Sequence, residues 1–285
     1  MKRIDCHVHV LPPDYRALLG DLPIPPARLE DYEAAMAASG IEAALISTGP
    51  PGAFMGDRGR ALELARAANE GIAAITDERF AGLATLPLPD VDAALSELAF
   101  GLDTLGLDGV MLLTSAAGIY LGDERWDPVL EELDRREAYV FVHPGFPPHA
   151  LPLEHPVWLY EFTFETVRAV ANLIYSGALE RYPRIRFQLA HLGGAVPFLA
   201  HRLASLADRV PEAAALAPAG ALEYLKRFYY DTGLADNAAA LTATREIVPD
   251  DRIVYGTDWP YAVRLEQPLE PPAENAAALV PRLAN

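Results

Sequence analysis

The chain has 285 residues, 51% of them hydrophobic and 22% charged, which is typical of a globular protein with a sizeable core. Its formal net charge of -17 argues against nucleic-acid binding, because a DNA or RNA surface requires a positive footprint. The sequence contains no apolar run of the roughly 20 residues that a membrane span needs. Since Cys6 is the single cysteine, we expect no internal disulfide and a cytoplasmic protein with one domain over residues 1–285.

Short apolar runs alternate with longer amphipathic stretches along the chain. The runs are rich in Val, Ile, Leu, Phe or Tyr and mostly bounded by Gly, Pro or Asp, which predicts strands. The predicted strands are Ile4–Val10, Ile41–Ser47, Phe80–Leu86, Gly109–Leu113, Ala138–His143, Ile185–His191, Phe228–Thr232 and Arg252–Thr257. The predicted helices between them include Leu29–Ser39, Arg58–Thr76, Asp90–Leu105, Pro128–Arg136, Phe164–Ser176 and Val196–Arg209.

Eight strands alternating with helices over this length predict an α/β protein with a (β/α)8 TIM barrel. An open doubly wound sheet is the main alternative from the pattern alone. Its dinucleotide-binding form is disfavoured, because no G-x-G-x-x-G follows the first strand. The Pro-rich segment Pro144–Pro156 directly follows a strand, where a barrel carries its active-site loops.

The segment Asp5-Cys6-His7-Val8-His9 lies on the first predicted strand. Alternation along a strand places His7 and His9 on one face, where two imidazoles can share a metal ion. A single strand histidine is more often a structural residue, but the paired spacing favours metal binding. Alternation also places Cys6 on the opposite face, so we interpret it as a core residue, and Asp5 as a supporting group.

Three more polar residues end apolar strands, namely His143, His191 and Asp258. The carboxyl ends of barrel strands converge on one face, so these residues are expected to meet His7 and His9. Such a nitrogen and oxygen donor set suits zinc, and also manganese or iron. The remaining histidines are interpreted as structural or solvent-facing: His149, His155 and His201.

The segment from Asp5 to Pro12 resembles the opening Asp-x-His-x-His-x-x-Pro signature of the amidohydrolase superfamily. Four further segments resemble its aminocarboxymuconate-semialdehyde decarboxylase branch: 141–144, 180–183, 189–194 and 255–260. The middle of the chain is most similar to the 6-methylsalicylate decarboxylase-like group, in three segments: 83–90, 120–123 and 172–177. The resemblance covers residues 1 to 261 and is specific for the branch, and only suggestive for a substrate.

The resemblance implies one divalent metal ion, with zinc expected first and manganese second. Its implied ligands are His7, His9, His143 and Asp258, with His191 beside the metal-bound water or substrate. Relatives outside the branch bridge two metals with a carbamylated lysine on the fourth strand. This chain has no lysine between Lys2 and Lys226, which independently supports a single-metal site.

Two departures from the branch concern substrate binding and the C-terminus. An arginine that grips a substrate carboxylate in semialdehyde decarboxylases aligns with Ala34, which makes that substrate doubtful. A second arginine, lent by a partner subunit in relatives, is matched by Arg202, which implies a homodimer or larger homo-oligomer. Only 27 residues follow Asp258, so the last helix is expected to be shortened or partly replaced.

The resemblance favours non-oxidative decarboxylation of a small aromatic or aromatic-like hydroxy carboxylic acid, such as one similar to 6-methylsalicylate. The metal would chelate the carboxylate and the neighbouring oxygen, and His191 or Asp258 would supply a proton to the ring carbon. The main alternative is a hydrolase that opens a lactone or amide with the same ligands. The third is a catalytically silent barrel that serves as a binding subunit. No organic cofactor, nucleic acid or membrane partner is implied.

Overall fold

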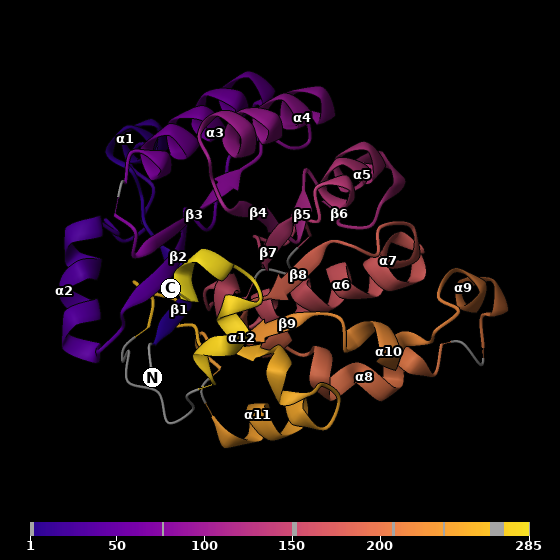
Figure 1. Cartoon of the computed structure of the whole chain (residues 1–285). Helices are drawn as coiled ribbons and strands as arrows, with labels where there is room; N and C mark the ends of the chain where they lie inside the picture. The colour runs from indigo at the N-terminus through magenta and orange to yellow at the C-terminus, as the bar shows by residue number, and fades with distance from the viewer. Residues whose placement is uncertain are drawn as a thin grey trace.

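The computed structural model describes residues 3–75, 77–149, 153–206, 209–235, 237–262 and 271–284. Eight parallel strands form one sheet, in which each strand lies beside the next barrel strand along the chain (Figure 1). Backbone hydrogen bonds from Cys6 to Tyr255 and from His9 to Trp259 join the first strand to the segment around the last. The predicted TIM barrel is therefore confirmed. The strands are β1 Ile4–His9, β2 Ala43–Ser47, β3 Phe80–Thr85, β4 Gly109–Leu113, β7 Tyr139–His143, β8 Arg186–Leu189, β9 Tyr229–Asp231 and β10 Ile253–Val254.

Helices surround the strands, and several begin at a side-chain cap. The carboxylates of Asp57 and Asp90 accept hydrogen bonds from the first turns of α3 and α4. The principal helices are α2 Leu29–Ser39, α3 Arg58–Ala73, α4 Val91–Ala99, α5 Asp127–Arg135, α6 Glu161–Tyr175, α8 Val196–Ala204 and α11 Ala238–Arg245. None of the described helices is long and apolar enough to cross a membrane.

Shorter elements fill the connections. They are α1 Pro13–Leu19, η1 Phe100–Thr104, the antiparallel pair β5 Ser115–Ala116 and β6 Ile119–Tyr120, η2 Glu124–Trp126, η3 Val157–Leu159, α7 Ala178–Arg181, η4 His191–Gly193, α9 Pro211–Leu216, α10 Ala221–Leu225, η5 Asp250–Arg252, α12 Ala273–Ala277 and η6 Pro281–Ala284. The helix predicted to reach Thr76 ends at Ala73, and Thr76 lies outside the described residues. The helix predicted to reach Arg209 ends at Ala204.

The barrel buries apolar side chains in two layers. Residues such as Leu45, Leu83 and Phe141 from neighbouring strands pack together in the inner layer. Residues such as Ile46 and Val140 pack with helix residues in the outer layer. The alternation of inward and outward side chains along each strand produces this division.

One irregularity in β1 changes which side chains face inward. Asp5 pairs with Ala44 and Val8 pairs with Ile46, so two residues of β1 lie opposite one residue of β2. Such a bulge interrupts the alternation of side chains. Cys6 consequently belongs to the inner cluster, and the expectation that it faces away from the histidines is wrong. Its interpretation as a buried core residue holds, since its exposed fraction is 0%.

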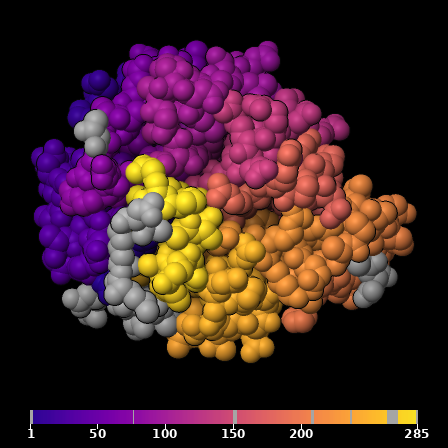
Figure 2. All heavy atoms as spheres, in the orientation of Figure 1, coloured from indigo at the N-terminus to yellow at the C-terminus, as the bar shows by residue number. Residues whose placement is uncertain are grey.

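The C-terminal segment closes the barrel at the end opposite the histidines. The helix α12 has five residues, so the last helix is indeed short. Buried residues from α12 to η6, including Leu279 and Leu283, pack against Ile4 and Ala43 at the starts of β1 and β2. Figure 2 shows this segment, in yellow, between the indigo and orange parts of one face. The packing leaves the carboxyl ends of the strands free to build a site.

We expect Leu279→Ala to lower the free energy of unfolding by about 2–5 kcal/mol, because Leu279 is buried and its truncation leaves a cavity. Urea denaturation followed by circular dichroism measures the change. Leu62→Ala on the exposed face of α3 is the control, with an expected change within about 0.5 kcal/mol. Equal small losses in both variants would show that the C-terminal segment contributes little to the folded core.

Candidate metal centre

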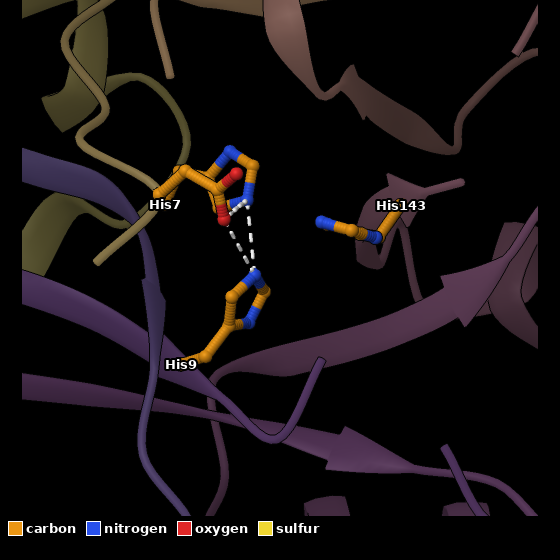
Figure 3. Close-up of side chains that lie close together, drawn as sticks. His7, His9 and His143 are labelled. Atoms are coloured by element: carbon orange, nitrogen blue, oxygen red, sulfur yellow. Dashed lines mark hydrogen bonds and ion pairs between the residues drawn. The ribbon is translucent and has the colours of Figure 1, made fainter. Parts of the chain in front are cut away.

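Four side chains meet at the carboxyl ends of the strands. His7 and His9 lie on β1, His143 is the last residue of β7, and Asp258 follows β10. One donor atom from each lies within 4.8 Å of the others. The carboxylate Oδ1 of Asp258 is 3.1 Å from Nε2 of His7 and 3.0 Å from Nε2 of His9. Figure 3 shows the three imidazoles pointing toward one shared space.

Hydrogen bonds at Nδ1 fix the tautomers of His7 and His143. Nδ1 of His7 is 2.9 Å from the carboxylate of Asp231, and Nδ1 of His143 is 2.8 Å from the carbonyl oxygen of Pro144. A carboxylate and a carbonyl only accept hydrogen bonds, so each Nδ1 carries the proton and donates it. Nε2 of each neutral ring is left with a lone pair directed at the shared space.

His9 is held in the same way by its neighbours on β1 and β2. Its Nδ1 donates to Oγ of Ser47 at 3.2 Å, and that hydroxyl in turn donates to the carbonyl of Val8. Gly49 has a φ of +65°, and a Cβ there would lie 2.4 Å from Nδ1 of His9. A glycine is therefore required beside the ring, both for its backbone conformation and for space.

The donor set fits one divalent cation. Nε2 of His7 and Nε2 of His9 are 3.1 Å apart, and two lone pairs at that distance repel each other unless a proton or cation lies between them. Nε2 of His143 is buried without a hydrogen-bond partner. Three imidazole nitrogens and one carboxylate oxygen are ordinary ligands of transition metals. Among the described residues, these four form the one group of this kind.

Protons compete with the metal at this site. Burial lowers the pKa of His7, but the carboxylates of Asp231 and Asp258 outweigh it and raise the pKa to about 10. Burial and the neighbouring imidazoles lower the pKa of His143 well below its usual value. Burial opposes ionisation of Asp258, but the imidazoles hold its pKa well below the usual range. The protein without metal thus keeps a proton on His7, which metal binding displaces.

Asp231, at the end of β9, was missed in the sequence. Its buried Oδ1 accepts hydrogen bonds from Nδ1 of His7 and from the backbone N–H groups of His191 and Gly233. Its Oδ2 accepts from Nε2 of Gln188 at 2.7 Å. Asp231 therefore orients one proposed ligand and the turn that carries His191. Its position within the predicted strand Phe228–Thr232, like that of the other polar strand-end residues, was the available signal.

Asp5 holds β1 against the segment that carries Asp258. Its carboxylate accepts hydrogen bonds from the backbone N–H and the hydroxyl of Thr257, from the backbone of His7 and from the hydroxyl of Tyr32. Burial raises the pKa of Asp5 to about 6 although these hydrogen bonds oppose the shift. The side chain supports the site from behind and does not enter the metal-binding group.

His191 contacts Oδ2 of Asp258, the carboxylate oxygen that does not face His7 and His9. Its Nε2 lies 3.1 Å from Oδ2 of Asp258, and its side chain is 11% exposed. Both residues have left-handed backbone conformations, with φ of 58° for His191 and 63° for Asp258. Residues other than glycine rarely adopt a positive φ, and those that do are concentrated at functional sites. The turns also explain why β8 ends at Leu189 and β10 at Val254, before the predicted strand ends.

The other candidate residues lie outside this group. Arg202 and His201 are exposed on α8, and His149 and His155 are exposed in the loop after β7. The structure of one chain does not bring Arg202 to the metal centre. A role for it therefore depends on a second subunit.

The fold and the site together define a metal-dependent barrel protein. The chain matches the amidohydrolase family over residues 4–281 and belongs to it, as the segment from Asp5 to Pro12 predicted. Over 278 residues it is 33% identical to a 6-methylsalicylic acid decarboxylase of Penicillium expansum, across 92% of this chain and 86% of that protein. Over 212 residues it is 30% identical to a 2-amino-3-carboxymuconate-6-semialdehyde decarboxylase of Dictyostelium discoideum, across 70% of this chain and 57% of that protein.

A solved structure shares the fold. A dihydroxybenzoic acid decarboxylase from Polaromonas sp. JS666, with bound manganese and the inhibitor 2-nitroresorcinol, superimposes with a TM-score of 0.79. The two chains are 23% identical, and the alignment covers 98% of this chain and 96% of that one. That protein shows that this fold can hold a divalent metal together with an aromatic ligand.

We expect one tightly held metal ion per wild-type chain and its loss in His143→Ala, because that substitution removes one of the converging Nε2 atoms. Asp231→Asn should weaken metal affinity by about 10–100-fold, since it alters the group that orients His7. Elemental analysis of protein purified without chelator, followed by metal titration, measures both effects.

His201→Ala is the matched control for this experiment, because it removes an exposed imidazole from α8. It should retain the wild-type metal content. Full occupancy in His143→Ala, or two tightly held ions in the wild type, would contradict the assigned site.

Proposed function

We propose that this chain is a metal-dependent, non-oxidative decarboxylase of a small hydroxylated aromatic carboxylic acid similar to 6-methylsalicylate. The observation that carries the proposal is the pair His191 and Asp258 at the edge of a single-metal site. One oxygen of Asp258 faces the imidazoles and the other contacts His191 at 3.1 Å. The similarity to decarboxylases over nearly the whole chain supports the same reaction.

We infer that His7, His9, His143 and Asp258 bind the ion. Three nitrogens and one oxygen suit zinc, which remains our first expectation, and also manganese. Bound there, the ion would supply a positive charge that attracts the substrate carboxylate and stabilises the negative charge that develops during the reaction. Reconstitution with each ion and comparison of the rates decides between them.

His191 and Asp258 then hold and transfer the proton that the ring carbon receives. His191 and Asp258 share a hydrogen bond, so a proton can be held between Nε2 and Oδ2 at the edge of the site. Transfer of that proton to the ring carbon bearing the carboxylate uses an electron pair of the ring. The carbon–carbon bond then breaks, its electrons restore the aromatic ring, and carbon dioxide leaves. No organic cofactor is required, because the ring accepts the electrons.

We expect the metal-loaded enzyme to release carbon dioxide from a 2-hydroxybenzoate and His191→Asn to lower kcat by about 10²–10⁴-fold. Asparagine can still contact Asp258, but it cannot transfer a proton at neutral pH. Ultraviolet absorbance and carbon dioxide are followed together, and metal content is measured in parallel. Metal content should stay at the wild-type level.

His201→Asn on the exposed face of α8 is the control, and it should leave kcat unchanged. Loss of metal in His191→Asn would make His191 a ligand, and an unchanged kcat would leave Asp258 as the proton donor. Hydrolysis of a lactone or amide without release of carbon dioxide from any acid would favour the hydrolase that uses the same ligands.

We also propose a homodimer or larger homo-oligomer in which Arg202 binds the substrate carboxylate of a neighbouring subunit. Phe198 lies one helical turn before Arg202 on α8 and is 87% exposed. Phe164 on α6 is 45% exposed. Large apolar side chains with this exposure are typical of surfaces that bind another protein.

Sedimentation at micromolar concentration should therefore give a dimer or larger species, and Phe198→Asp should shift it toward the monomer. Arg202→Ala should keep the assembly and lower kcat/KM. Leu62→Asp, which charges an exposed position on α3, is the control for Phe198→Asp. A wild-type species of 30.9 kDa would contradict the assembly, and full activity of Arg202→Ala would remove its role.

A further inference from the structure

A cavity of about 970 Å³ opens among the loops that follow β2, β3, β4 and β7. Met111 and Leu113 of β4 form part of its wall, together with Gly145 just after β7. Leu113 is the register partner of His143 in the neighbouring strand. The cavity therefore begins one strand away from a metal-site histidine, where the ring of a bound acid can extend into it.

The wall of this cavity is largely apolar. It includes Trp126, Trp158 and Phe146, and none of its lining residues is Arg, Lys, Asp or Glu. The one titratable lining side chain is His149, which is exposed to solvent. The hydroxyl of Thr85, one of the few polar groups, is already hydrogen-bonded to Thr48 at 2.9 Å. A carboxylate placed against the buried part of this wall would lose its hydration without gaining an Arg or Lys partner, and His149 lies at the exposed part, whereas an apolar group would gain by leaving water.

The volume exceeds what a methyl-substituted ring needs. An acid the size of 6-methylsalicylate has about 11 non-hydrogen atoms, and at no more than ~30 Å³ each they occupy at most ~330 Å³. That upper bound is about a third of the cavity. The remaining space, lined by apolar side chains, suits a substituent several carbons long.

We propose that this cavity binds an extended apolar substituent, either an alkyl chain or a second ring, carried by the aromatic acid, and excludes a second carboxylate. This inference rests on the proposed decarboxylase function and specifies its substrate class. Met111 and Leu113 are the proposed specificity-determining residues on β4, the strand that pairs with the His143 strand, and Ala116 on β5 borders the cavity farther along the chain.

A series of 2-hydroxybenzoates that differ at ring position 6 tests the proposal. The position carries hydrogen, methyl, pentyl or carboxylate, and kcat/KM is measured on the metal-loaded enzyme. Each buried methylene is worth about 0.8 kcal/mol, or about fourfold. The pentyl acid should therefore exceed the methyl acid by at least about tenfold, and the dicarboxylate should fall at least about 100-fold below it. Equal rates for the pentyl and unsubstituted acids, or efficient turnover of the dicarboxylate, would overturn the proposal.

Two variants alter the wall at half-buried positions of β5. Ala116→Phe narrows the cavity and should lower the pentyl-to-hydrogen ratio of kcat/KM by at least about tenfold. Ser115→Arg supplies a cation and should raise the carboxylate-to-methyl ratio by at least about tenfold. Ala37→Phe on the exposed face of α2, which does not line the cavity, is the matched control and should change neither ratio. Unchanged ratios in both β5 variants would overturn the assignment of the cavity.

A binding measurement separates this inference from the proposed reaction. The fluorescence of Trp126 and Trp158 in the cavity wall reports the binding of 3-pentylphenol, phenol and 3-hydroxybenzoate without turnover. Tighter binding of 3-pentylphenol than of phenol, and loss of that difference in Ala116→Phe, would support the apolar preference of the cavity. This support holds even when no acid releases carbon dioxide. Absence of carbon dioxide release would reject the decarboxylase function and leave the cavity assignment intact. Equal binding of the two phenols would overturn the preference even when turnover is observed.

Discussion

The metal site depends on one arrangement, in which every imidazole donates its Nδ1 proton away from the centre. Asp231 accepts from His7 at 2.9 Å, and the carbonyl of Pro144 accepts from His143 at 2.8 Å. If either ring were flipped or reprotonated, a proton would occupy the space where the lone pairs converge. The acceptors behind the rings therefore contribute to the metal affinity together with the four donors.

The barrel supplies the rigidity that this arrangement needs, and it tolerates local strain where the side chains must be aimed. Asp258 has a φ of 63°, yet its backbone N–H is bonded to the carbonyl of His7 at 2.8 Å. Asp5 ties the neighbouring Thr257 to the same strand. Such strain persists only when surrounding contacts over-determine the conformation. The buried C-terminal residues around Leu279 pack at the opposite end of the barrel from the site.

Much of the site could be predicted because its residues follow strand ends, and barrel topology brings strand ends together. The pairing of His7 with His9, and the positions of His143 and Asp258, required only the period of a strand and the order of the elements. The bulge in β1 could not be predicted, because strict alternation assumes a strand without inserted residues. That assumption placed Cys6 on the wrong face of the strand. The position of Asp231 near the end of a predicted strand indicates a place at the mouth of the barrel, but its hydrogen bond to His7, 224 positions away in the chain, could not be predicted from a local pattern.

The site and the cavity divide the recognition of a substrate between two kinds of interaction. In the proposed reaction a metal ion and the His191–Asp258 pair would act on a carboxylate and its neighbouring hydroxyl, groups that every 2-hydroxybenzoate has in common. Those contacts cannot distinguish one such acid from another, so discrimination must come from surfaces that touch the rest of the ring. Loops between strands can change in sequence without disturbing the donors. A barrel with a fixed metal centre can therefore acquire a new substrate through the loops after β2, β3, β4 and β7. In this chain we propose that the apolar wall around Trp126 and Leu113 selects the substituent of the ring.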